Sequence, residues 1–286
     1  MTMNPSATIR LFLPFGDPKR VRTAEISNWS GKAIAAPRTD LDHFLQRPEL
    51  ANPGVYFLLG SDPESGEPSA YIGEAEAVCD RLKQHKSKEF WSSAIVFVSK
   101  DENLTKAHIR YLEGRLIAEA ISVGRYKLTN AAGSGSKLPE SDQQDIEVFL
   151  ERIAQLLPVL GSELLTPVAP EPKTTAPADI LYCTVRDIEA KGLRSPNGFV
   201  VLQGSTAVLK EREAAKVHAA WILALRAKLV ADGSLVQDGG KLVFTKDVEF
   251  ASPSAAAGVV RGGNAAGPIA WINKQGQTLK DLEGSA

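Results

Sequence analysis

Cysteine is nearly absent from this 286-residue sequence. The two cysteines, Cys79 and Cys183, lie far apart in the chain and show no metal-ligand spacing. A zinc site and a disulfide framework are therefore both disfavoured, and the composition is typical of a protein from a reducing compartment.

An excess of charge of either sign is also missing, since 33 Lys and Arg stand against 34 Asp and Glu, a net charge of −1. The chain as a whole does not attract phosphate backbones, so any DNA binding would need a local basic patch. One candidate patch is the basic residues of the N-terminal segment: Arg10, Lys19, Arg20, Arg22, Lys32 and Arg38. They could face phosphate or be ordinary solvated strand residues, and the sequence leaves both open.

Long hydrophobic runs are absent as well. No stretch approaches ~18 apolar residues, and the first residues lack a charged segment that leads into an apolar one. We therefore expect a soluble cytoplasmic protein with no membrane partner. The oligomeric state is not indicated.

The chain length suits two domains. Five prolines between Pro158 and Pro177 predict an extended linker. The expected organisation is α+β: an N-terminal β extension packed on a central domain, the central domain itself, the linker and a second small α+β domain, at residues 1–49, 50–157, 158–178 and 179–286.

The central domain carries the chemistry-bearing residues. Two apolar runs separated by a turn-rich interval predict a β-hairpin, followed by a helix, a strand and a second helix, at residues 54–59, 70–73, 75–88, 94–98 and 104–121. Arg81 and His85 are four residues apart, so the first helix projects a guanidinium and an imidazole on the same side.

Five features in this order resemble the GIY-YIG nuclease superfamily over residues 50–155. They are Gly54-Val55-Tyr56, Tyr71-Ile72-Gly73, Arg81 with His85, Tyr111-Leu112-Glu113, and Asn130. Valine replaces isoleucine in the first motif, a conservative change in a strand. The interval between the two motifs is longer than in compact members, and we place the extra residues in the hairpin loop.

The resemblance implies a three-stranded antiparallel or mixed sheet flanked by helices, and a DNA endonuclease site. It assigns a general-base role to Tyr56 with Tyr71 as its positioning partner, although the sequence itself cannot order the two. It also implies that Arg81 clamps the scissile phosphate and that His85 bonds a tyrosine or phosphate. Asn130 would fix the phosphate-holding loop, and Tyr111 would supply a supporting hydroxyl.

The chemistry of these side chains is consistent with those roles. Glu113 offers a hard oxygen ligand for Mg²⁺ or Mn²⁺, and one carboxylate suffices for a single-metal site. Arg81 can bind a phosphate bidentately. A tyrosine with an ordinary pKa of ~10 is a poor base at neutral pH, so Tyr56 or Tyr71 must be assisted by Arg81, His85 or a metal-bound water.

Structural roles compete with these assignments. Either tyrosine could be a half-buried strand residue, Arg81 and Glu113 could form a structural ion pair, and His85 could be a surface histidine. A second functional hypothesis is therefore a nucleic-acid-binding protein whose GIY-YIG core no longer cleaves.

The C-terminal half predicts a helix at residues 211–230 with Val217, Trp221, Leu225 and Leu229 on its apolar stripe. Ser252 is expected to N-cap a short helix that has Pro253 at its first position. The tail resembles a domain of unknown function often joined to GIY-YIG domains and found at the end of some restriction-type adenine methylases. That resemblance implies a role in engaging DNA.

Overall fold

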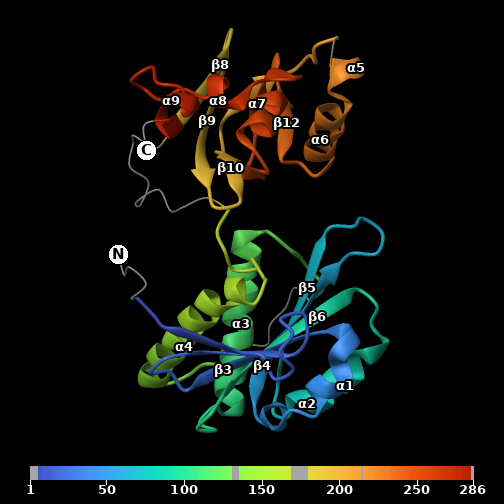
Figure 1. Cartoon of the computed structure of the whole chain (residues 1–286), viewed down its shortest axis with the longest axis vertical. Helices are drawn as coiled ribbons and strands as arrows, with labels where there is room; N and C mark the ends of the chain where they lie inside the picture. The colour runs from blue at the N-terminus through green and yellow to red at the C-terminus, as the bar shows by residue number, and fades with distance from the viewer. Residues whose placement is uncertain (1–5, 131–134, 169–179, 214, 285–286) are drawn as a thin grey trace. The chain divides into compact units, whose positions relative to one another are not determined.

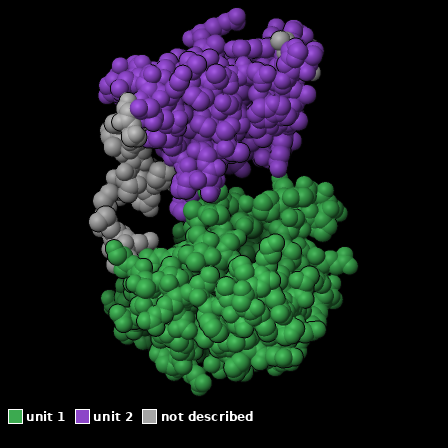
Figure 2. Space-filling view, in the orientation of Figure 1, with its two compact units in different colours: residues 1–166 green, residues 167–286 purple. Residues whose placement is uncertain are grey.

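The structure is a computed structural model that describes residues 6–130, 135–168, 180–213 and 215–284. The chain divides into two compact units, Met1–Thr166 and Pro167–Ala286 (Figure 2). Each unit has its own sheets and helices, so the expected α+β class is confirmed.

Unit 1 is built on one seven-stranded sheet with the order β1-β2-β3-β6-β4-β5-β7. The strands are β1 (Ile9–Phe12), β2 (Arg22–Ile26), β3 (Gly31–Pro37), β4 (Gly54–Ser61), β5 (Pro68–Ala75), β6 (Trp91–Ser99) and β7 (Lys127–Leu128). The sheet is wider than the three strands expected because β3 pairs antiparallel with β6 over its whole length. The N-terminal strands therefore continue the central sheet.

Helices cover both faces of this sheet (Figure 1). On one face lie α1 (Leu41–Leu45), α2 (Val78–Gln84) and the 3-10 turns η1 (Arg38–Asp40), η2 (Pro48–Ala51) and η3 (His85–Ser87); on the other lie α3 (Lys106–Val123) and α4 (Glu140–Val159). Side chains alternate along a strand, so Val55 and Phe57 pack under α3 and α4 while Tyr56 and Leu58 face α2. Strand β4 is therefore buried on both faces.

Four of the six N-terminal cations are engaged within unit 1. Arg20 pairs with Asp40 at 2.8 Å, Arg38 donates to the Lys86 carbonyl at 2.7 Å, and Arg22 donates to the Leu160 carbonyl at 3.3 Å. The fourth, Lys32, belongs to the network described next. Because these cations bind the protein itself, the N-terminal segment offers less of a phosphate-facing surface than its composition suggests.

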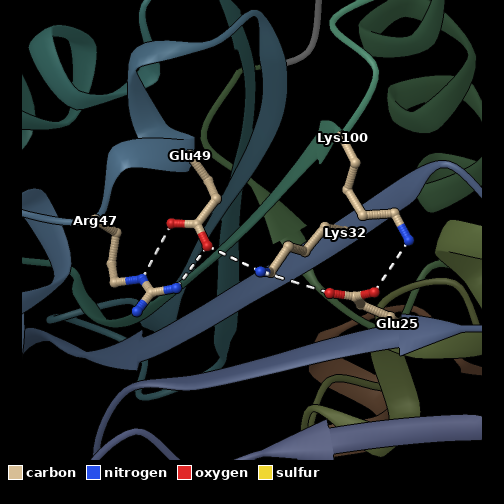
Figure 3. A network of polar contacts seen from close by, with 5 residues as sticks. All are labelled: Glu25, Lys32, Arg47, Glu49 and Lys100. Atoms are coloured by element: carbon tan, nitrogen blue, oxygen red, sulfur yellow. Dashed lines mark hydrogen bonds and ion pairs between the residues drawn. The ribbon is translucent and has the colours of Figure 1, made fainter.

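A five-residue ionic network ties the N-terminal strands to the rest of the sheet (Figure 3). Lys32 lies between Glu49 at 2.9 Å and Glu25 at 3.5 Å. Arg47 binds Glu49 through two nitrogens at 3.1 and 2.5 Å, and Lys100 binds Glu25 at 3.0 Å. A network of this kind holds its side chains at a lower entropy cost per pair than isolated surface bridges do.

Glu49 gives this network a measurable pH dependence. Burial acts to raise its pKa, but hydrogen bonds from Arg47 and Lys32 outweigh burial and lower the pKa to about 2. The stabilisation is therefore fully present above the ordinary glutamate pKa of about 4.5 and is lost as the pH falls toward 2. We expect Glu49→Gln to lower the free energy of unfolding by about 2 kcal/mol at pH 7.

Urea unfolding of the full chain at pH 7 and pH 3 measures this effect. The difference between wild type and Glu49→Gln should shrink by more than half at pH 3. Glu151→Gln, on the exposed side of α4, is the matched control and should change stability little at either pH. A pH-independent difference would mean that the Glu49 carboxylate is not what stabilises the network.

The segment that follows α4 was expected to begin the linker. Instead Leu160, Leu164 and Leu165 are buried in the core of unit 1. Residues 169–179, the remainder of the expected linker, lie outside the described residues.

The described residues of unit 2 form two small sheets and five helices around one core. One sheet has the order β14-β10-β9-β8 and the other β11-β13-β12. The elements are β8 (Leu181–Val185), β9 (Ile188–Ser195), β10 (Gly198–Val201), β11 (Thr206–Val208), α5 (Ala215–His218), α6 (Ala220–Ala231), β12 (Leu235–Asp238), β13 (Lys241–Phe244), β14 (Val248–Phe250), α7 (Pro253–Arg261), α8 (Gly267–Ala270) and α9 (Leu279–Gly284). The Ser252 N-cap is confirmed, because its hydroxyl accepts from the Ala255 N–H at 3.1 Å.

The apolar stripe expected on the long helix of unit 2 is half right: Leu229 is buried and Leu225 packs against the core, whereas Val217 and Trp221 are exposed. The helix is broken between α5 and α6, and Trp221 is 54% exposed. Ile222, Arg226 and Leu229 are the buried residues of α6. The inner face therefore includes an arginine, which a hydrophobic pattern cannot assign to a core.

Among the described residues, no helix combines the length and apolar character needed to cross a bilayer.

Candidate functional site

Tyr56 and Tyr71 lie on the same face of the β4–β5 hairpin. In the register of the pair, Tyr56 is opposite Gly73 and Leu58 is opposite Tyr71, so the two tyrosines form a diagonal pair. Their ring centroids are 6.0 Å apart and the planes are inclined by 21°, a stacked arrangement. Tyr56 is fully buried, whereas Tyr71 is partly exposed.

Gly73 provides the space that the Tyr56 ring occupies. A β-carbon at this position would lie 2.4 Å from both Cζ and the hydroxyl oxygen of Tyr56. Such an approach is far inside van der Waals contact, and the ring is packed too tightly to yield freely. Glycine is therefore required at position 73 for a steric reason, because the absence of a side chain lets the Tyr56 ring lie across the neighbouring strand.

His85 joins the tyrosine pair from the end of α2. Its Nε2 and the Tyr56 hydroxyl share a hydrogen bond of 2.9 Å, and its ring centroid is 4.9 Å from that of Tyr71. The Trp91 indole donates to the His85 carbonyl at 3.0 Å, which holds the backbone in place. Burial, with the charges of Lys88 and Arg81, lowers the pKa of His85 to about 4, so the imidazole is neutral at pH 7.

Two cations border this cluster. Arg81 projects from α2 and donates to Gln84 at 2.8 Å, and the Lys88 ammonium lies 4.4 Å from the centroid of the Tyr71 ring. The nearby Tyr56 hydroxyl, and to a lesser degree that of Tyr71, raises the pKa of the Arg81 guanidinium. Within the described part of the chain, neither cation has an acidic side chain at ion-pair distance, so both charges are available to an anion.

The Tyr56 hydroxyl is held in its protonated form. Burial raises the pKa of this phenol, and the neighbouring Tyr71 adds to the increase, while the Arg81 guanidinium acts in the opposite direction. A proton can leave the phenol only if a neighbouring group accepts it at the same time. The His85 nitrogen is placed to do so.

Asn130 anchors the chain beside this hairpin. Its side-chain oxygen accepts from the Ile72 N–H at 3.1 Å, and its side-chain nitrogen donates to the Ile72 carbonyl at 2.5 Å. Strand β7 pairs only with Ser69 and Ala70 of β5. Beyond it, the Asn130 amide satisfies the backbone groups of Ile72 that a neighbouring strand would otherwise bind. This contact is structural and fits the expected role of fixing a loop.

Glu113 comes from α3, on the opposite face of the sheet. It is partly buried and lies seven residues beyond Lys106, hence on the same side of the helix. Lys106 pairs at 2.5 Å with Glu76, just past the end of β5, so this side of α3 faces the strand that carries Tyr71. α3 packs against β5, so Glu113 lies on a helix beside the strand that carries Tyr71, and its metal-ligand role stays a prediction.

Tyr111 is not brought to the cluster. Its hydroxyl donates to Glu147 at 2.6 Å, and the same carboxylate binds Arg115 through two nitrogens at 2.6 and 3.0 Å. These contacts join α3 to α4 on the far side of α3 from Lys106. The tyrosine therefore stabilises helix packing in this structure.

The structure thus brings Tyr56, Tyr71, Arg81 and His85 together, and adds Lys88, which the sequence interpretation missed. No sequence pattern pointed to Lys88, because it is the 3-10 turn η3 that brings this residue toward Tyr71. The arrangement can hold an anionic oxygen between two cations and can pass a proton between a phenol and a neutral imidazole.

Comparison with known proteins assigns only unit 2. Residues 181–283 match the family described as "Domain of unknown function (DUF4357)". No curated protein and no solved structure matches the chain. The resemblance of residues 50–155 to the GIY-YIG nucleases stays a prediction.

Proposed function

We propose that this protein is a metal-dependent endonuclease that hydrolyses DNA phosphodiester bonds at the cluster of unit 1. The observation that carries the proposal is the 2.9 Å contact between a buried tyrosine and a neutral histidine beside two cations without acidic partners. A phosphodiester needs both features, because its negative charge must be bound and its attacking water must lose a proton.

Each residue of the cluster has a separate role in this reaction. Arg81 binds the scissile phosphate through its planar fork of N–H groups, and Lys88 adds a second positive charge beside Tyr71. Tyr56 accepts a proton from the attacking water while its own hydroxyl proton passes to His85 Nε2. Tyr71 stacks on Tyr56 and orients its ring. In this arrangement the raised pKa of Tyr56 is no obstacle, since the free phenolate never accumulates.

The residues present fit a single Mg²⁺ or Mn²⁺. Glu113 on α3 would supply one hard carboxylate, and the described residues include no group of three or more His, Cys, Asp or Glu side chains that could hold a metal. Mg²⁺ commonly binds through one or two carboxylates with water and phosphate oxygens completing its shell. When bound, the cation would neutralise charge on the phosphate oxygens.

A cleavage assay over a panel of duplex, branched and single-stranded DNA, with Mg²⁺ or Mn²⁺, tests the proposal. We expect wild type to cleave at least one substrate, and EDTA to abolish cleavage. Arg81→Ala and Glu113→Gln should each lower the rate by at least about 100-fold, because each removes a group that binds the charge of the transition state.

Two variants serve as controls on the same helices. Lys83→Ala removes a cation of α2 that pairs with Asp80, and Glu119→Gln removes a carboxylate of α3; both should keep wild-type rates. Full activity in Arg81→Ala and Glu113→Gln would refute this site. DNA binding without turnover on any substrate would instead support the non-cleaving alternative.

A further inference from the structure

Unit 2 contains a charged cavity, which the proposed nuclease site does not use. It has a volume of 580 Å³ and lies where the β8–β9 turn, the segment after β11 and the end of α7 meet. Its charged lining comprises Arg186, Asp187, Lys210, Glu211, Arg212 and Arg261. Four cations and two carboxylates thus surround one space.

The positive charge of this lining is not cancelled locally. Among the residues that the structure describes, none of the four cations has a carboxylate within ion-pair distance. Arg261 is held by weaker contacts, from Nε to the Cys183 sulfur at 3.3 Å and from a terminal nitrogen to the Thr184 carbonyl at 3.4 Å. These contacts orient the guanidinium without neutralising it.

One of the two carboxylates is already engaged. Glu211 lies 3.6 Å from the buried Arg226, which is only 3% exposed. Arg226 also donates to the carbonyls of Val208, at 2.7 Å, and Val259. This buried guanidinium therefore links the segment after β11 to α7 and pairs with Glu211, so Asp187 is the one carboxylate of the lining left to offset its four cations.

Arg186 is positioned by an unusual backbone. It occupies the β8–β9 turn with a φ of 52°, a left-handed conformation that favours glycine or asparagine. This conformation is strained for an arginine, and such strain is tolerated where the surroundings or a ligand require it. The turn aims a cation at the rim of the cavity.

The rest of the lining is aliphatic. Val185, Ile188, Val208 and Leu209 line the same space as the arginines. The cavity is far larger than a phosphate ion needs and falls within the roughly 300–1,000 Å³ of small-molecule sites. A ligand that fits must combine an anionic group with a flat or apolar body.

We propose that this cavity binds a nucleoside phosphate, with the phosphate held by Arg186 and Arg212 and the base against the aliphatic wall. The ligand is either a free nucleotide or one nucleotide of a DNA strand, since both present the same chemistry. The site is separate from the cluster of unit 1 and does not depend on whether that cluster cleaves DNA.

Isothermal titration calorimetry on the full chain tests the proposal. The probes are 2′-deoxyadenosine 5′-monophosphate, 2′-deoxyadenosine, inorganic phosphate and a single-stranded 12-nucleotide DNA, the last with Glu113→Gln to prevent turnover. We expect the monophosphate to bind more tightly than either of its parts. Arg212→Gln and Arg186→Gln should each weaken binding about tenfold or more, because each removes charged hydrogen bonds.

Arg194→Gln is the matched control, because Arg194 is exposed on β9 in the same unit and does not line the cavity. Loss in both cavity variants but not in this control supports the proposal. If only the 12-mer binds, with the same pattern, the ligand is a nucleotide within a strand. If no probe binds, if phosphate binds as well as the monophosphate, or if all three variants weaken binding equally, the proposal is overturned.

Discussion

Gly73→Ala is expected to lower DNA cleavage by at least about 100-fold. The added methyl group would lie 2.4 Å from Cζ and the hydroxyl oxygen of Tyr56, so the ring must leave its place. A displacement of the ring by about 1 Å breaks the 2.9 Å contact with His85 and misaligns the proton relay. Because the ring is fully buried, we also expect the substitution to lower the melting temperature by several degrees.

Gly60→Ala separates the two effects. A β-carbon there would lie 2.0 Å from the Phe90 carbonyl oxygen, so this variant also strains β4, but at the end of the strand away from Tyr56. Both variants should be assayed at a temperature at which each is folded, as shown by circular dichroism. We expect Gly60→Ala to retain its activity under those conditions. An equal loss in both would mean that strand stability, and not the position of Tyr56, limits cleavage.

The second large effect is expected at the tyrosine–histidine pair. Tyr56→Phe keeps the ring but removes the hydroxyl, and His85→Gln keeps a hydrogen-bond acceptor but cannot take up a proton. General acid–base groups contribute about 10²–10⁴ in rate, so each variant should lose at least about 100-fold in kcat with little change in KM. Wild-type-like kcat in His85→Gln would show that His85 only positions Tyr56.

The pH profile provides an independent measure of the same role. Because the pKa of His85 is lowered to about 4, the imidazole is neutral above pH 5 and can accept a proton there. We expect the wild-type rate to fall as the pH drops toward 4, and this fall to be absent from the residual activity of His85→Gln. The free energy of unfolding should depend on the same histidine, because its pKa is lower in the folded than in the unfolded chain. The contribution of the neutral histidine is complete above pH 6.5 and is lost as the pH falls toward 4.

Local sequence patterns predicted the elements of the central domain well, because each of these helices and strands follows from the residues within its own segment. The β4–β5 hairpin, β6 and α3 were all expected near their observed positions, and the period of two along β4 and β5 places both tyrosines on one face. The helix that carries Arg81 is shorter than expected and ends at Gln84. The 3-10 turn that follows, η3, brings Lys88 toward Tyr71, and no periodicity in the sequence indicated it.

Pairing between strands far apart in the chain was harder to predict from the sequence. The β character of residues 1–49 was expected, but the joining of these strands to β6 as one sheet depends on partners more than fifty residues away. The inner face of α6 was misassigned because Arg226 is buried there, and its burial is compensated by carbonyls of β11 and α7. Neither partner can be identified from the sequence around the helix.

Taken alone, the amino-acid order determined the α+β class, the hairpin and the short set of side chains that could act on a phosphate, since those follow from periodicity and residue chemistry. Only the folded chain decided that Tyr56 crosses Gly73 to meet His85, that Tyr111 turns to Glu147, and that Arg186 and Arg212 line one cavity. These outcomes depend on steric fit and hydrogen-bond partners from distant segments, which come together only when the sheets and helices pack.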